Sequence, residues 1–316
     1  MTALRYPRRC TLAFALAAAL AAPAYAQQVV ADGDDQTPAA GDYRTTDPVE
    51  PGNPAGHAFH VINGGSIIPQ GEVNLHTEGQ RATAARVEGA GSRLQLVGGS
   101  ITTLGYAAGG LSVGTGADAT LAGTRIDIHA GEGTGLLTDG GQVQADAVHI
   151  SIHGALGAGV RAQSGRIELR DSVVEMLGMS SKGLDASGGD IVAERVRIEL
   201  AAAGDSVSAS NGGTVSLVDS QINGSGAGSR GVSVALGSRV SLDNVDIQLN
   251  HERSGPGLFV GGELSMRGGS IQTAGSNSTA IDYAARGGKV SLDGTQVSGY
   301  YGIFMSEDSE LLLQNS

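Results

Sequence analysis

Apolar and polar residues alternate in a pattern that repeats about every 24 residues, from roughly residue 85 to residue 316. Each copy opens with an apolar–polar–apolar run and then carries three apolar residues at the spacing i, i+2, i+7. Repeats of this period are typical of solenoids. The first apolar positions are Leu111, Leu136, Val160, Leu184, Val207, Val232, Leu258, Ile281 and Ile303. The spaced trios are Leu94/Leu96/Ile101, Ala119/Leu121/Ile126, Val143/Ala145/Ile150, Ile167/Leu169/Val174, Ile191/Ala193/Ile198, Val215/Leu217/Ile222, Val240/Leu242/Ile247, Leu264/Met266/Ile271 and Val290/Leu292/Val297.

The apolar runs are short and have the period of a β-strand rather than that of a helix. No stretch after residue 26 offers the ten or more residues at 3.6 spacing that a helical solenoid needs. One copy cannot bury its apolar face alone, but stacked copies bury it together. The pattern therefore predicts an all-β protein, a parallel β-helix of about ten rungs over residues 85–316, each rung being one repeat. Residues 57–84 repeat poorly and are expected to form irregular first rungs or an N-terminal cap.

Turn residues separate the predicted strands. Asp171-Ser172, Asp219-Ser220, Asp243-Asn244 and Asp293-Gly294 follow the second strand, where Asp, Asn and Gly tolerate left-handed backbone geometry. Glycine precedes the first apolar residue in seven of nine copies, and we expect it there because it reaches positive φ. These glycines are Gly110, Gly135, Gly159, Gly183, Gly231, Gly257 and Gly302.

The N-terminal residues have a different composition. Residues 1–26 have the form of a secretory signal peptide, with arginines before an apolar run and Ala24-Tyr25-Ala26 at its end, which predicts cleavage between Ala26 and Gln27. The apolar run is too short for a good membrane span. Residues 27–56 are rich in Pro, Asp, Gln and Thr, which predicts a disordered leader or linker.

The net charge and the cysteine content limit which partners the chain can bind and which compartment it occupies. The chain has a net charge of −12 and only two lysines, Lys182 and Lys289, which argues against binding nucleic acid or anionic lipid. The single cysteine, Cys10, lies within the predicted signal, so the mature chain has no disulfide. The mature chain is expected to be exported without spanning a membrane.

Two clusters of titratable residues are candidate sites of chemistry. Glu175 and Glu199 occupy equivalent positions one rung apart beside Arg197, and carboxylates about 5 Å apart can serve a retaining glycosidase. His129 and His153 are also equivalent, but zinc needs three or four ligands and no third is assignable. Both clusters are better explained as solvated faces, so no catalytic residue, metal site or cofactor is predicted. An exported carbohydrate-active enzyme remains the alternative.

Aromatic residues gather late in the chain and are the candidate binding residues. Phe259 and Phe304 fall at outward positions two rungs apart, and Tyr300 and Tyr301 lie close by. Exposed aromatic side chains bind sugar rings or partner proteins. Packing under the loop Leu249–Pro256 is the other explanation. Candidate binding loops are Leu249–Pro256, Tyr106–Gly110 and Ala274–Thr279.

The predicted rungs from residue 57 to residue 316 resemble pertactin-like autotransporter passenger domains. The resemblance rests on the A-x-A signal, the acidic chain without mature cysteine, and two rungs that open at Gly231-Val-Ser-Val and Gly257-Leu-Phe-Val. It implies a right-handed parallel β-helix, secretion to the cell surface of a Gram-negative bacterium, and adhesion to a host protein or glycan.

Two departures from that family bear on function. Pertactin carries an Arg-Gly-Asp tripeptide, which this sequence lacks, so an integrin-type receptor does not transfer. Family members end in a translocator β-barrel, whereas the residues Leu311–Ser316 fall within a rung. The expectation is therefore an adhesin passenger shown without its barrel, with a truncated gene product as a further alternative.

Overall fold

The computed structural model describes residues 28–49, 56–276, 278–283 and 287–316, and these residues form β-strands and turns without a helix. The predicted all-β class and parallel β-helix are confirmed. The expected signal peptide and its cleavage site at Ala26 and Gln27 lie outside the described residues. Among the described residues no helix is long and apolar enough to cross a membrane.

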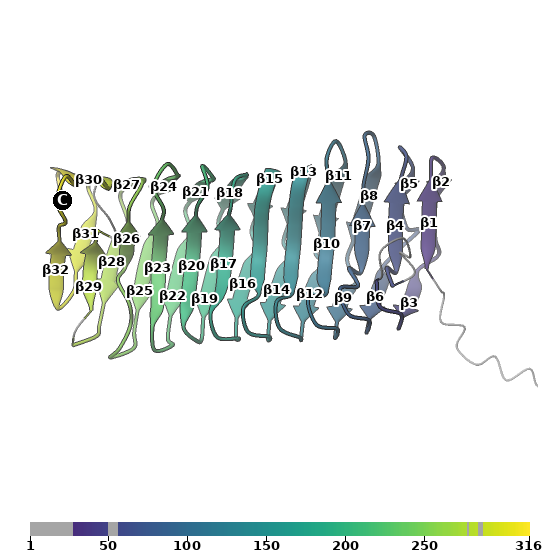
Figure 1. Cartoon of the computed structure of the whole chain (residues 1–316), viewed down its shortest axis with the longest axis horizontal. Helices are drawn as coiled ribbons and strands as arrows, with labels where there is room; N and C mark the ends of the chain where they lie inside the picture. Colours follow the sequence, from purple (N-terminus) through teal and green to yellow (C-terminus); the bar gives the residue numbers. More distant parts are fainter. Residues whose placement is uncertain (1–27, 50–55, 277, 284–286) are drawn as a thin grey trace, which may run out of the picture.

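The strands stack into a rod with one rung beside the next (Figure 1). Each rung has three strand positions, which we call first, second and third in chain order. The strands at the first and second positions share a 22-stranded sheet. In two rungs a single long strand, β13 (Thr134–Asp146) or β15 (Ala158–Arg170), covers both the first and the second position. The other first strands are β1 (Val29–Asp32), β4 (Phe59–Ile62), β7 (Ala85–Val87), β10 (Gly109–Gly114), β17 (Ser181–Ala186), β20 (Gly204–Ala209), β23 (Ser229–Val234), β26 (Leu258–Val260), β29 (Thr279–Asp282) and β32 (Tyr301–Phe304).

The other second strands are β2 (Asp35–Gln36), β5 (Ser66–Ile67), β8 (Arg93–Val97), β11 (Asp118–Ala122), β18 (Asp190–Glu194), β21 (Thr214–Val218), β24 (Arg239–Asp243), β27 (Glu263–Arg267), β30 (Lys289–Asp293) and β33 (Glu310–Gln314). Third strands form a separate 11-stranded sheet. They are β3 (Gly41–Thr45), β6 (Val73–Thr77), β9 (Ser100–Thr103), β12 (Arg125–Ile128), β14 (His149–Ile152), β16 (Val173–Met176), β19 (Arg197–Leu200), β22 (Gln221–Gly224), β25 (Asp246–Leu249), β28 (Ser270–Thr273) and β31 (Gln296–Ser298).

The strand register follows the sequence repeat. Leu111 pairs with Leu136, which in turn pairs with Val160, and the strands of the described residues pair in parallel. The trio residue Ile126 pairs with Ile150 in the same way. All of these side chains point inward and are fully buried. Burying each one stabilises the folded chain by roughly 1.5–3 kcal/mol. The core is therefore a set of apolar ladders that run along the rod.

Residues 29–49 differ from the predicted disordered leader, because they form a rung. Ala31 is fully buried, and Tyr43 packs edge-on against Phe59 with ring centroids 5.0 Å apart. Polar side chains of this segment form hydrogen bonds with the next rung. For example, Asn63 Nδ2 donates to Asp32 Oδ1 at 2.6 Å. Stacking on the second rung thus gives this polar segment a partner that its composition does not reveal. Residues 59–77 supply the three strands β4, β5 and β6 of that second rung.

The glycines before the first apolar residue are present for a different reason from the one expected. None of the seven has positive φ. A Cβ on Gly135 would lie 2.5 Å from the carbonyl oxygen of Gly159 and 2.6 Å from Ile150 Cγ2, and five others would meet the next rung in the same way. Close approach of neighbouring rungs, rather than backbone conformation, therefore requires glycine. The left-handed turns are confirmed at Asp171, Asp219, Asn244 and Gly294.

Candidate binding surfaces

The outer face of the third-strand sheet holds Glu175 and Glu199, the acidic pair that is the candidate for catalysis. Glu175 and Glu199 are register partners, as expected. Glu175 lies 3.0 Å from His149 Nε2, and Asn223 Nδ2 donates to Glu199 at 3.0 Å. Partial burial is the largest single effect and opposes ionisation of Glu175, but the hydrogen bonds from His149 and Ser151 and the charges of His149 and Arg197 together outweigh it, so the pKa of Glu175 is lowered. A general acid needs the opposite shift, which disfavours glycosidase chemistry here.

The two equivalent histidines stack on the same side of the rod. The imidazole rings of His129 and His153 are 4.5 Å apart and nearly parallel, at 6°. Asp127 Oδ1 lies 3.9 Å from His153 Nε2, and Arg125 also bonds this carboxylate. Within the described part of the chain, no three His, Cys, Asp or Glu side chains are grouped to hold a metal ion.

The four aromatic residues predicted to bind a ligand lie in two different environments. Tyr300, Tyr301 and Phe304 are exposed at one end of the rod, and the two tyrosine rings meet edge-on at 4.9 Å. Phe259 falls in the same outward column as Phe304, with Asp282 between them. Phe259 is half-buried instead, because the Arg230 guanidinium lies 5.2 Å from its ring centroid.

A row of ion pairs leads away from Phe259 along the first strands, and the sequence alone did not single it out. Arg230 Nε lies 2.9 Å from Asp205, and Asp185 accepts hydrogen bonds from Arg161 at 2.9 Å and Lys182 at 2.8 Å. Burial raises the pKa of Asp205, with Arg230 opposing the shift. These opposite charges lie within ion-pair distance of one another, so this face has little capacity for a new charged ligand.

Large apolar side chains gather at one corner of the rod, in the turns that lead from third strands to first strands. We call this set the corner stripe. Its members are unusually exposed, from 43% for Leu104 to 66% for Met179. The turns lie along the lower edge of the rod in Figure 1. The stripe consists of Leu104, Tyr106, Leu156, Leu177 and Met179.

Backbone hydrogen bonds hold these turns in register from rung to rung. Leu104, His129, His153 and Leu177 each follow a third strand directly, and each N–H bonds a carbonyl of the rung before. In the other direction, the Leu156 N–H bonds the Met179 carbonyl of the next rung at 2.9 Å. With about 4.8 Å per rung, the column from Leu104 to Leu177 extends about 14 Å along the rod. Of these turns only the Tyr106 loop is predicted from the sequence, because apolar residues in turns look like breaks in the strand pattern.

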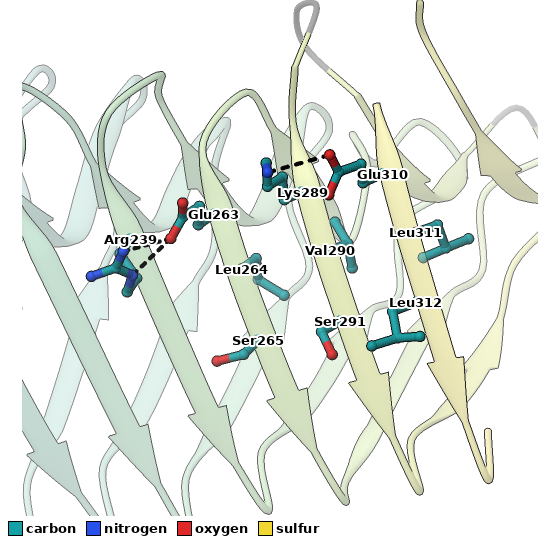
Figure 2. Close-up of a pocket in the computed structure, with 10 residues that line it drawn as sticks. All are labelled: Arg239, Glu263, Leu264, Ser265, Lys289, Val290, Ser291, Glu310, Leu311 and Leu312. Carbon is teal, nitrogen blue, oxygen red and sulfur yellow. Dashed lines mark hydrogen bonds and ion pairs between the residues drawn. The ribbon is translucent and has the colours of Figure 1, made fainter. Parts of the chain in front are cut away.

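A groove of about 570 Å³ opens over the second strands near the C-terminal end. Figure 2 shows Ser265, Ser291 and Leu312 in one row across neighbouring strands, with the charged residues in a second row. Arg239 donates two hydrogen bonds to Glu263, at 3.0 and 2.6 Å, and Lys289 Nζ lies 3.3 Å from Glu310. This groove could not be predicted from the sequence, because its polar residues occupy ordinary outward strand positions.

Comparisons with known proteins bear on the fold. No family model and no curated protein matches this sequence. The chain is similar to Vag8, solved by cryo-EM as the Vag8–C1 inhibitor complex, with a TM-score of 0.63 and 19% identity over 90% of this chain and 77% of that chain.

Two further solved structures align less well. One is the receptor-binding domain of the Siphovirus 9NA tailspike, with a TM-score of 0.32 and 11% identity over 89% of this chain and 72% of that one. The other is a hyper-glycosylated TibA fragment, with a TM-score of 0.22 and 11% identity over 88% and 94%. Both scores are too low to support an argument. From its parallel strands, its rung length and its alignment to Vag8, the chain has a parallel β-solenoid fold similar to that of Vag8.

Proposed function

We propose that this chain is an exported, non-enzymatic adhesin that binds a protein on the surface of a host cell through the corner stripe. The observation that carries the proposal is the exposure of five large apolar side chains in the turns of three rungs, with the turn of His129 and Glu132 between Tyr106 and Leu156. Large exposed apolar side chains gathered on one side of a soluble protein mark a candidate interaction site. The predicted signal peptide and the passenger fold support a place at the cell surface or outside the cell, with a translocator barrel as the export partner.

The comparison supports a protein partner over an enzymatic role. The Vag8 structure is a complex with C1 inhibitor, so a rod of this fold binds a protein there. In this chain the best-placed carboxylates, Glu175 and Glu199, are bonded to neighbours on an open face. The exposed residues Tyr300, Tyr301 and Phe304, with Phe259 behind them, are proposed as a second and smaller contact.

Binding of the purified mature chain to cultured host cells, measured by flow cytometry, tests the proposal. Leu156→Asp and Met179→Asp are expected to weaken binding at least tenfold each, because a charge in the apolar centre of an interface removes about 1.4 kcal/mol or more. Asp also tolerates the positive φ of 61° at Leu156.

The matched control is Leu236→Asp, which adds the same charge at a side chain that is 75% exposed outside the stripe. Its binding is expected to stay within twofold of the wild type. Equal losses in all three variants, or no cell binding by the wild type, would refute the stripe as the contact. Release of oligosaccharides from a panel of polysaccharides would refute the non-enzymatic role.

A further inference from the structure

The groove over β24, β27, β30 and β33 has a row of serine hydroxyls in its lining, of which Ser265 is exposed and Ser291 is half-buried. Ser241, Ser265 and Ser291 occupy one outward column, register partner by register partner, and Leu312 continues it. Among the described residues, the one hydrogen bond between these hydroxyls is a long one of 3.4 Å, from Ser265 to Ser241. Each serine therefore offers a donor and an acceptor to a ligand.

The charges that border the groove cancel one another. Arg239 and Lys289 contribute two positive charges, and Glu263 and Glu310 contribute two negative charges, so the lining is neutral. Each cation is within ion-pair distance of a carboxylate of the next rung. A charged ligand would have to displace one of these pairs, and the chain's net charge of −12 further repels polyanions.

The groove also has apolar surface of the right kind for a sugar ring. Leu264 and Val290 are buried in the core, so they border the groove through their backbones. Leu312 is 52% exposed, and the aliphatic stems of Arg239 and Lys289 line the opposite row. Hydroxyl groups beside such carbon surface match the alternating hydroxyl groups and C–H faces of a pyranose.

We propose that this groove binds a neutral oligosaccharide that lies along the rod axis, with its hydroxyl groups on Ser265 and Ser291. Rungs recur about every 4.8 Å, so successive sugar units meet equivalent serines. The inference extends the proposed adhesin function, because it assigns that function a second ligand class at a site apart from the corner stripe.

A printed array of neutral and acidic glycans, probed with the purified mature chain, tests the class of ligand. Neutral glycans are expected to bind, and the best of them is then titrated by calorimetry against variants. Ser265→Val and Ser291→Val each remove a hydroxyl and are expected to weaken binding about tenfold, and the double variant more. Valine suits an outward strand position, so folding is retained.

Ser216→Val is the matched control, because Ser216 occupies the same outward column on β21 but does not line the groove. Its affinity is expected to match the wild type. Binding of acidic glycans alone, binding of no glycan, or equal losses in Ser216→Val and Ser265→Val would overturn the proposal. None of these outcomes affects the corner stripe, whose variants Leu156→Asp and Met179→Asp are tested by cell binding and are expected to keep full glycan affinity.

Discussion

At the scale of single residues, the spacing between rungs depends on the absence of side chains at one corner. Six of the glycines before the first apolar residue have a carbonyl of the next rung within 2.8 Å of where a Cβ would lie. Ser206 and Ala280 fill the two remaining positions of this column, and both are small. The column therefore tolerates very little volume.

Gly110→Ala tests this packing. Its Cβ would lie 2.6 Å from the Gly135 oxygen and 2.9 Å from Ile126 Cγ2, and overpacking of this kind destabilises by about 1–3 kcal/mol. The adjacent Gly109→Ala is the control, because its nearest contact would be an ordinary 3.4 Å. Urea unfolding should show a clearly lower midpoint only for Gly110→Ala, and equal midpoints would contradict a steric role.

A second residue, His57, links stability to pH. It is 1% exposed, and its Nδ1 lies 2.8 Å from the Thr83 carbonyl. Burial lowers its pKa from 6.5 to about 4, with small opposing and reinforcing effects from Thr83, His60, Arg86 and Glu88. The unfolded chain thus binds more protons than the folded chain between these two values.

Stability is therefore expected to fall as the pH falls from about 6.5 to 4, by up to about 3 kcal/mol from this one group. Above pH 6.5 the imidazole is neutral in both states, so its contribution is fully retained. The measurement is the free energy of unfolding of wild type and His57→Asn between pH 4 and pH 7. A pH slope that is the same in both proteins would rule out His57 as the group responsible.

At the scale of elements, the turn after each second strand uses one residue with left-handed geometry. In successive rungs this position holds Gly123, Ala147, Asp171, Arg195 and Asp219, with φ between 48° and 65°. Asp and Gly at this position were predictable from turn chemistry. Ala147 and Arg195 were not, because the hydrogen bonds of the stacked rungs impose the conformation on residues that do not favour it.

Ala147→Gly is consequently expected to stabilise the protein, by about 0.5–1 kcal/mol. Left-handed geometry is unfavourable for a residue with a Cβ, and the exposed Ala147 side chain has no packing to lose. Ala122→Gly, at a position in β11 without positive φ, should instead destabilise by a similar amount. Thermal unfolding that shifted both variants in the same direction would contradict this account.

At the scale of the whole molecule, the repeat predicted the rod and the register of its core. The sequence could not show that the polar segment 29–49 stacks as a rung, because its stability comes from the rung beside it. It also could not reveal the corner stripe or the groove. Both are made by residues about 24 positions apart that are unremarkable within any one repeat.

The rod itself explains why binding surfaces on this chain are long and shallow. Each rung contacts only its neighbours, so a side chain repeated at one position becomes a line along the axis. The corner stripe and the serine column are two such lines on different faces. An adhesin of this form gains affinity by adding similar contacts over several rungs rather than by enclosing a ligand.

Methionine oxidation by hydroxyl radicals, read by mass spectrometry on the free chain and on the chain bound to host cells, tests the central claim most directly. Met179 in the corner stripe is 66% exposed and Met305 at the aromatic end is 46% exposed, whereas Met176 and Met266 are buried and serve as internal references. The account predicts that cell binding protects Met179 from oxidation several-fold. Oxidation of Met179 at the same rate in both states, with or without protection of Met305, would contradict it.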